Sequence, residues 1–201
     1  MVARARKQTS KGLSGGDAAP VLHFREVTDE TWQDFEQLFE SRGGPRNCWC
    51  MVWRGIGEAA ARPDGATRKT AMKQRIHAGV PVGILGYVGD MPVAWCSIAP
   101  RETYRQGLAD AQCGDAEESV WSIACFFVSR SARGQGAFNS LLQAAEVHAK
   151  AHGATVLEGY PVDEDSPSYR FGGFLPSFDK AGFAPAGRAG ARRHVVRKRL
   201  A

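Results

Sequence analysis

The segment whose residue types best suit ligand binding is Arg133-Gly134-Gln135-Gly136-Ala137. Glycine lets the backbone turn tightly and approach a ligand closely. A helix that begins just after such a loop presents unpaired N–H groups and the positive end of its dipole, which together suit a pyrophosphate. The loop is not a P-loop, because no Gly-Lys-Ser/Thr follows it. It is not the dinucleotide fingerprint either, because the third glycine is absent.

The elements around this loop follow from the hydrophobic pattern. An apolar run at 120–128 is typical of a strand covered on both faces. Apolar residues at helical spacing predict a helix over 135–152, with Gly153 as its C-terminal glycine. A strand at 155–160 follows, so the three elements form a right-handed crossover that makes one parallel strand pair.

Further elements are predicted on both sides of this unit. Before it we expect a strand at 21–27, a helix that begins at Thr28 or Asp29 and ends before Gly43, and a second helix at 67–78. Strands at 82–88 and 92–98 flank Gly89-Asp90 and predict a hairpin. After the unit we expect a short helix at 176–181 and a last strand at 194–199. The fold class is therefore α/β, with a mixed sheet and flanking helices.

Length and composition indicate one domain at 20–201, preceded by a disordered basic tail at 1–19. The net charge of +5 is unevenly distributed: residues 20–187 carry 16 basic and 20 acidic residues, whereas 188–201 carry six basic residues and no acidic one. A basic end is more typical of a solvated tail or edge strand than of a nucleic-acid arm, so nucleic-acid binding is a minor hypothesis. No apolar run reaches membrane-spanning length, and the N-terminus lacks a signal-peptide core, so we expect a soluble, cytoplasmic protein.

The cysteines are odd in number: Cys48, Cys50, Cys96, Cys113 and Cys125. An odd count, with Cys96 and Cys125 inside apolar runs, favours reduced thiols packed in the interior. Cys48-Trp49-Cys50 has no second Cys/His pair at ligand spacing, so no metal site is expected.

The order of elements and the loop motif resemble the GNAT superfamily of N-acetyltransferases. The family's coenzyme-A motif reads (Gln/Arg)-x-x-Gly-x-(Gly/Ala), and residues 133–136 match its first four positions. The resemblance covers about residues 20–200 and includes Ala181-Gly182-Phe183, which is similar to the "GF" after the family's last short helix. It implies a mostly antiparallel sheet with one parallel, splayed strand pair, and transfer of an acetyl group from acetyl-CoA, with no metal, to a small-molecule or peptide amine. It leaves the oligomeric state open, a homodimer included.

The resemblance also implies the residues that contact coenzyme A. The edge of the strand at 120–128 would hold the pantetheine arm through Phe126, Phe127 and Val128, where a backbone N–H polarises the thioester carbonyl. The loop would hold the diphosphate through residues 133–138: Arg133, Gly134, Gln135, Gly136, Ala137 and Phe138. Phe138 stands where the family has Gly or Ala, so its bulk is expected beside the diphosphate. Phe178 stands where many members have the Tyr that protonates the thiolate.

Proton transfer therefore needs other groups, since an alkyl amine with a pKa of about 10.4 is mostly protonated at pH 7. Glu158 could be the base, or could face solvent. Tyr160 could donate a proton to the thiolate, or could pack at a strand end. Tyr169 could serve instead, or could anchor a loop. Trp49 and Trp53 could shape the acceptor pocket or belong to the core. Because the family's usual acid is missing, a non-catalytic acyl-CoA-binding module is the alternative function.

Overall fold

The computed structural model describes residues 21–56, 63–108, 118–134 and 136–200; the expected tail at 1–19, Gln135 and Cys113 lie outside these ranges. The described residues form a seven-stranded sheet in the order β1-β2-β3-β4-β5-β7-β6. Its strands are β1 (His23–Glu26), β2 (Ile84–Val88), β3 (Met91–Pro100), β4 (Val120–Val128), β5 (Val156–Gly159), β6 (Ala184–Ala189) and β7 (Arg193–Arg199). β4 and β5 are parallel, and the other neighbouring strands are antiparallel, as the sequence predicts.

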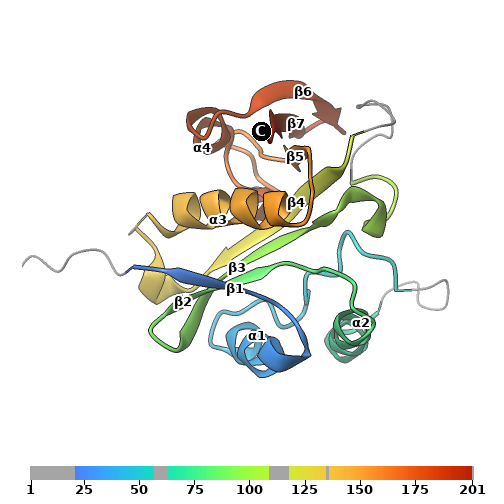
Figure 1. Ribbon diagram of the computed structural model, residues 1–201, viewed down its shortest axis with the longest axis vertical. Coiled ribbons are helices and arrows are strands. Elements are labelled where there is room, and N and C mark those ends of the chain that lie inside the picture. Colours follow the sequence, from blue (N-terminus) through green and yellow to red (C-terminus); the bar gives the residue numbers. More distant parts are fainter. Residues whose placement is uncertain (1–20, 57–62, 109–117, 135, 201) are drawn as a thin grey trace, which may run out of the picture.

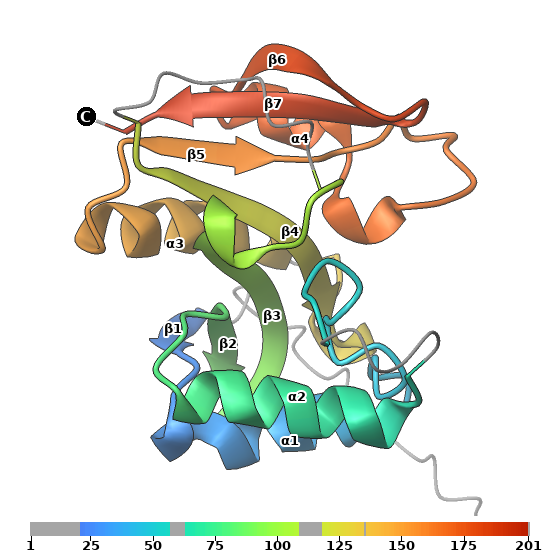
Figure 2. The ribbon, with the colours of Figure 1, turned by 90° about the vertical axis from the view of Figure 1, so that its right-hand side faces the viewer.

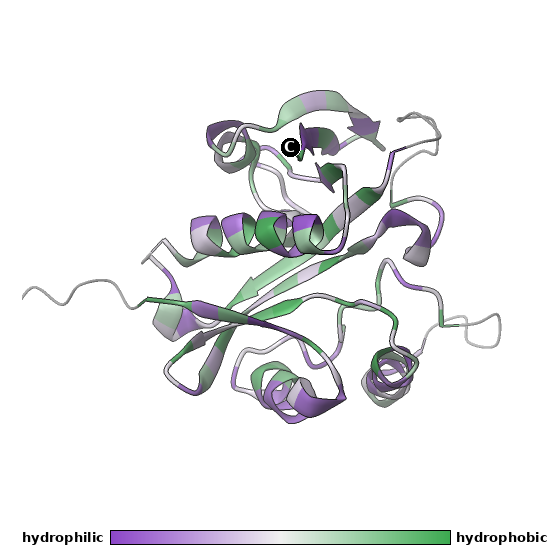
Figure 3. Cartoon of the chain, viewed as in Figure 1, coloured by the Kyte–Doolittle hydropathy of each residue, from purple (hydrophilic) through white to green (hydrophobic). Residues whose placement is uncertain are grey.

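Helices cover both faces of the sheet. Helix α3 (Ala137–Ala151) and the short α4 (Leu175–Lys180) pack on one face, and α1 (Trp32–Glu40) and α2 (Gly65–His77) pack on the other (Figure 1). The central strands are largely hydrophobic, whereas the outer sides of α1 and α2 are hydrophilic (Figure 3). Short 3-10 turns η1 (Asp29–Thr31), η2 (Arg101–Thr103), η3 (Arg130–Ala132) and η4 (Arg170–Gly172) connect the elements. Among the described residues, no helix is both long and apolar enough to cross a bilayer.

Helix α3 is held at both ends by a glycine in the left-handed region. Gly136 caps its N-terminus with φ 75°, so the helix begins at Ala137 instead of the expected residue 135. At the other end Gly153 has φ 79°, its N–H donates to Lys150 O at 3.0 Å, and Ala154 N–H donates to Ala149 O at 3.0 Å. This paired arrangement is the expected glycine C-cap. The helix therefore has a fixed start at the loop that precedes it.

Strand β6 was missed by the sequence analysis, which has no strand between 181 and 194. Its sequence, Ala-Pro-Ala-Gly-Arg-Ala, has low β propensity because proline cannot donate to a ladder and glycine has no side chain to pack. The structure tolerates both because β6 is an edge strand that pairs with β7 alone, with an irregular register between Pro185 and Gly187. Consequently β7 lies between β5 and β6, which corrects the expectation of a solvated tail or edge strand.

A bulge and a separation of strands shape β4. Its pairing with β3 shifts between Ser97 and Ile98, so that Ala124 is the extra residue on β4. Its pairing with β5 covers only 120–123, although β4 continues to Val128. In Figure 2, β4 runs between β3 on one side and β5 on the other. Beyond Ile123 the two parallel strands part, and none of the strands described pairs with β4 on that side.

Candidate active site

An apolar cavity of about 190 Å³ lies beside the part of β4 that has left β5. The bulged strand contributes Ala124, Cys125, Phe126 and Phe127 to its lining, and η4 contributes Phe171. The segment between α1 and α2 supplies the opposite wall: Pro45, Cys48, Cys50, Val52 and Trp53, with Ser97 from β3. Because the lining is almost entirely apolar, this cavity suits a small uncharged group or a hydrocarbon chain.

Unusual backbone conformations gather around this cavity. Trp49, Cys50 and Tyr169 have φ of 47°, 50° and 60°, which is the left-handed region that such residues avoid. Their surroundings hold them there: Trp95 Nε1 donates to Cys50 Sγ at 3.0 Å, and Arg54 donates to Cys50 O at 3.0 Å. Strained residues of this kind cluster at functional sites. Of the two tryptophans predicted for an acceptor pocket, Trp53 lines the cavity, while Trp49 is buried among the aromatic residues of α1.

Two cysteines of the cavity wall differ in their surroundings. A hydrogen bond with Cys125, together with burial, raises the pKa of Cys50 well above its usual range, so this thiol stays protonated. Cys125 packs against the core as expected, but it is only half-buried because it also lines the cavity. The bulge explains why Cys125 lines the cavity, because it turns Ala124 and Cys125 toward the same face of the sheet.

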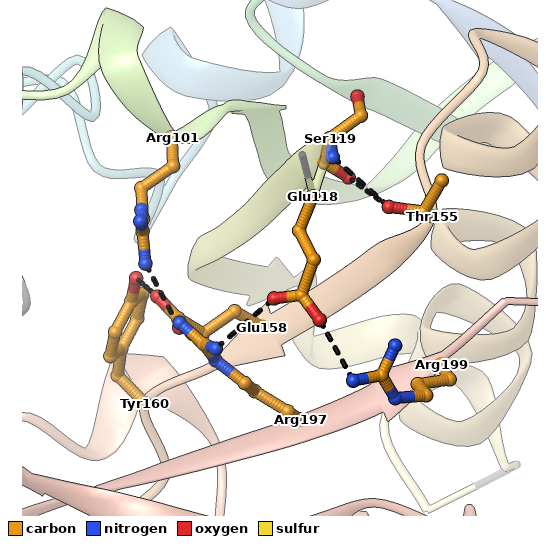
Figure 4. Close-up of polar contacts among 8 residues, drawn as sticks. All are labelled: Arg101, Glu118, Ser119, Thr155, Glu158, Tyr160, Arg197 and Arg199. Atoms are coloured by element: carbon orange, nitrogen blue, oxygen red, sulfur yellow. Dashed lines mark hydrogen bonds and ion pairs between the residues drawn. The ribbon is translucent and has the colours of Figure 1, made fainter. Parts of the chain in front are cut away.

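Glu158 and Tyr160 lie in a buried polar network on the face of the sheet opposite α3 (Figure 4). Glu158 is 0% exposed, accepts a hydrogen bond from Arg197 Nε at 2.6 Å and lies 3.5 Å from Arg101 NH1. The hydroxyl of Tyr160 donates to Glu158, and the hydroxyl of Ser122 donates to Tyr160 across 2.9 Å. Glu158 therefore does not face solvent, which removes one of the two interpretations of the sequence.

Burial raises the pKa of Tyr160 well above its ordinary value, and the neighbouring charge of Glu158 raises it further. The phenol thus keeps its proton at neutral pH. Neither Tyr160 nor Glu158 belongs to the described lining of the cavity, although Tyr160 packs in one cluster with Ala124, which does.

Tyr169 lies nearer the solvent in the same region, and Arg193 lies over the rings of both Tyr160 and Tyr169. Its side chain is partly exposed, and its ring stacks on Trp53 at 6.3 Å between centroids and contacts Phe171 at 6.0 Å. The guanidinium of Arg193 lies over both the Trp53 and Tyr169 rings. Two candidate phenols therefore flank the cavity, one buried in a polar network and one near solvent.

The glycine loop lies at the other end of the β4 edge. Gly134 and Gly136 both have positive φ, of 76° and 75°, and a Cβ added at either would meet no atom of the described residues within 4 Å. The space above the loop is therefore open, and the first N–H groups of α3 have no partner within the helix. Arg133 Nε donates to Val128 O at 3.0 Å, which ties the loop back to the end of β4.

A second hollow, of about 540 Å³, opens next to this loop. It is lined by Arg42, Gly43, Phe127, Arg130 and Arg133. Three guanidinium groups around one hollow make it suited to an anion. Of these three arginines, the sequence analysis identified Arg133 alone. The position of Arg130, three residues before Arg133, could have placed it at the same loop. Arg42 is far away in the sequence, so no local pattern could have placed it there. Phe127 lines both this hollow and the apolar cavity, so the edge of β4 joins the two.

Near the point where β4 and β5 part, aromatic side chains pack on the face of the sheet that α3 covers. Phe138 packs its ring against Phe126 at 4.6 Å and approaches Phe178 at 6.2 Å, so its bulk contacts these rings of the core. Phe178 is fully buried and lies so close to β5 that a Cβ on Gly159 would clash with its ring. No hydroxyl is present at this position, where the family resemblance implies a tyrosine.

The chain is similar to known acetyltransferases in both its sequence pattern and its fold. A family model described as "Acetyltransferase (GNAT) family" matches residues 24–171. A search of curated proteins found no significant match. Solved structures share the fold at low identity. An uncharacterized protein from Bacillus halodurans is 14% identical with a TM-score of 0.57, covering 89% of this chain and 83% of that chain.

Two further solved structures carry functional names. An acetyltransferase from Thermus thermophilus is 14% identical with a TM-score of 0.54, covering 91% of this chain and 99% of its own. The PaiA N-acetyltransferase from Thermoplasma acidophilum, solved in complex with coenzyme A, is 11% identical with a TM-score of 0.51, covering 89% and 99%. At these identities the structures establish the shared fold.

Proposed function

Because this chain belongs to the GNAT acetyltransferase family, we propose that it transfers an acetyl group from acetyl-CoA to a primary amine by direct attack in a ternary complex. The observation that carries the proposal is the unpaired edge of β4. It begins beside the apolar cavity, passes Phe127, which lines both hollows, and ends at the glycine loop. A ligand with an anionic end, an extended arm and a small apolar head matches this sequence of surfaces.

The residues at the loop fit the anionic end of coenzyme A. Gly134 and Gly136 leave open space above the backbone, the N-terminus of α3 supplies N–H donors, and Arg42 and Arg130 add positive charge. In the proposed complex residues 133–138 hold the diphosphate, with Gln135 part of the motif although it lies outside the described residues. Phe126, Phe127 and Val128 supply the strand edge for the arm, whose backbone groups pair like those of an added strand.

The cavity beside β4 is the proposed place for the acetyl group and for the amine that attacks it. Its apolar lining excludes water from the reacting groups and disfavours the charged form of an amine. The acceptor, whether a small molecule or a peptide, would enter past Trp53 and Phe171.

Proton transfer is assigned to the phenols that flank the cavity. Tyr160 is the proposed donor to the leaving thiolate, because it retains its proton and follows β5 where the strands part. Its O–H donates to Glu158 and would turn to the thiolate as the carbon–sulfur bond breaks, and the proton that the attacking nitrogen loses would restore the phenol. Tyr169, near solvent, is the competing candidate.

A second candidate function is a non-catalytic acyl-CoA-binding module. Phe178 supports it, because this buried ring places no acid where the resemblance implies one. The module would bind acetyl-CoA through the same loop and strand edge but release no coenzyme A.

The test is a thermal-shift titration with acetyl-CoA, followed by measurement of thiol release with a panel of small amines and peptides. ADP and ATP are the controls for simple phosphate binding. At about 100 times its dissociation constant, acetyl-CoA is expected to stabilise the protein by roughly 2.7 kcal/mol, or about 5 to 10 °C for a chain of this size.

A saturable shift with acetyl-CoA alone, together with amine-dependent thiol release, is the expected result. A shift without thiol release on any amine would favour the binding module. No shift in a folded sample would overturn both candidates.

A further inference from the structure

Three potential metal ligands meet away from the proposed active site. Glu26 is the last residue of β1, and His148 and His152 lie one turn apart near the end of α3. One side-chain ligand atom from each lies within 4.8 Å of the other two. Two histidines at i and i+4 lie on one face of a helix, and a carboxylate from a neighbouring strand completes a ligand set of two imidazoles and one carboxylate.

His152 is already oriented as a metal ligand. Its Nδ1 lies 2.9 Å from His148 O, so Nδ1 carries the proton and donates to this carbonyl. The other ring nitrogen, Nε2, is the atom that would bind a metal in the neutral ring, and it lies 3.6 Å from Glu26 Oε2. Histidines that bind metals commonly donate their second ring nitrogen to a backbone carbonyl in this way.

His148 supplies an independent observation. Its Nε2 is buried and has no hydrogen-bond partner among the residues that the structure describes. An unsatisfied buried nitrogen is costly, and an ion or water bound nearby is a common reason for one. The ring is held in place by Trp121, whose ring meets it at 5.5 Å and also contacts His152 at 5.1 Å.

We propose that Glu26, His148 and His152 bind a divalent transition-metal ion of the zinc type. In a tetrahedral zinc site, ligand atoms lie roughly 3.3 Å apart, so the three side chains need only small rotations, which the partly exposed Glu26 and His152 can make. The fourth position faces a surface hollow of about 730 Å³ whose lining includes Glu26 and His148. Solvent or an added ligand can therefore complete the coordination.

The bound ion would join two distant segments. Glu26 ends the edge strand β1, whereas the histidines belong to the helix that begins at the glycine loop. Metal binding would thus fasten the N-terminal strand to α3. This role is independent of the proposed acetyl transfer, and it differs from the expectation from sequence that the protein holds no metal.

The experiment titrates the full chain, prepared without a histidine tag, with Zn²⁺ by calorimetry and with Co²⁺ by absorption spectroscopy. The variants are His152→Ala and Glu26→Gln, both at partly exposed side chains, and thermal unfolding of each variant confirms that it is folded. The matched control is His77→Ala, because His77 also pairs with a carboxylate, Asp29, at 3.1 Å but belongs to no cluster of three ligands among the described residues.

We expect one Zn²⁺ to bind per chain. Its affinity should fall at least about tenfold in His152→Ala and in Glu26→Gln and should be unchanged in His77→Ala. Bound Co²⁺ should give the absorption bands in the visible range that nitrogen and oxygen ligands produce. The proposal would be overturned if no metal bound, or if binding survived both variants. It would also be overturned by the near-ultraviolet absorption of a cobalt–thiolate complex, which would place the ion at the cysteines.

Discussion

Tyr160 and Tyr169 show how differently two tyrosines near the cavity are held. Tyr160 is fixed by two hydrogen bonds and shielded from water, so its hydroxyl has a defined direction. Tyr169 is held by ring stacking on Trp53, and its side chain is partly exposed to solvent. Ring stacking does not fix the direction of a hydroxyl, whereas the O–H of Tyr160 is held toward Glu158 and must turn from it to reach a thiolate.

This contrast predicts the behaviour of the two phenylalanine variants. Tyr160→Phe should lower kcat roughly 10²-fold or more, the usual contribution of a positioned acid, with little change in acetyl-CoA affinity. Tyr169→Phe keeps the stacked ring and should stay within about twofold of the parent kcat. Steady-state kinetics and calorimetry with acetyl-CoA measure both quantities. The reverse pattern would transfer the role to Tyr169.

The junction of β4 and α3 is the element on which the proposed coenzyme site depends. The strand leaves its parallel neighbour, the loop is tied back by Arg133, and Gly136 sets the start of the helix. A β-branched residue at Gly136 would both fill the space and strain the backbone, so it could not separate binding from folding.

Asparagine separates the two effects, because it tolerates the left-handed conformation better than other residues with a side chain. Gly136→Asn should keep a melting temperature close to that of the parent and weaken acetyl-CoA binding at least about tenfold, since its side chain enters the space above the loop. Gly153→Asn is the matched control, with φ 79° and equally open space at the far end of the same helix. Equal affinity in both variants, measured by calorimetry, would contradict the assignment of the loop.

Much of this element-scale organisation could be predicted from sequence. The spacing of apolar residues located α3, and Gly89-Asp90 located the β2–β3 hairpin, because both signals are local. Strand β6 was missed because its partner β7 and its edge position override weak propensity. The bulge at Ala124 and the approach of Arg42 to the loop were also missed, since both depend on contacts between distant segments.

At the scale of the whole molecule, ion pairs made by β7 balance part of the uneven charge of the sequence. Arg197 pairs with Glu158 and Glu118, Arg199 pairs with Glu118, and Lys198 pairs with Glu146. Three of the six basic residues at 188–201 are thus bound to acidic groups of the body, two of them in the network of Figure 4. This internal pairing leaves little reason to assign those residues to nucleic-acid binding.

Pairs that differ in burial should differ in their contribution to stability. Glu158→Ala leaves Arg197 and Tyr160 without their shared, fully buried partner and should cost about 3 to 5 kcal/mol of unfolding free energy. Glu146→Ala breaks the partly exposed pair with Lys198 and should cost less than about 1 kcal/mol. Urea unfolding followed by circular dichroism gives both values. Equal losses would mean that burial does not set the strength of these pairs.

The short parallel contact between β4 and β5 also has a consequence for how the chain folds. The hairpins β2–β3 and β6–β7 join neighbours in sequence, so they close small loops and can form early. The pairing of 120–123 with 156–159 must wait until the whole of α3 has crossed between them. This stretch of the sheet, beside which the cavity opens, is therefore expected to assemble after the two hairpins, and its formation should be sensitive to how readily α3 packs.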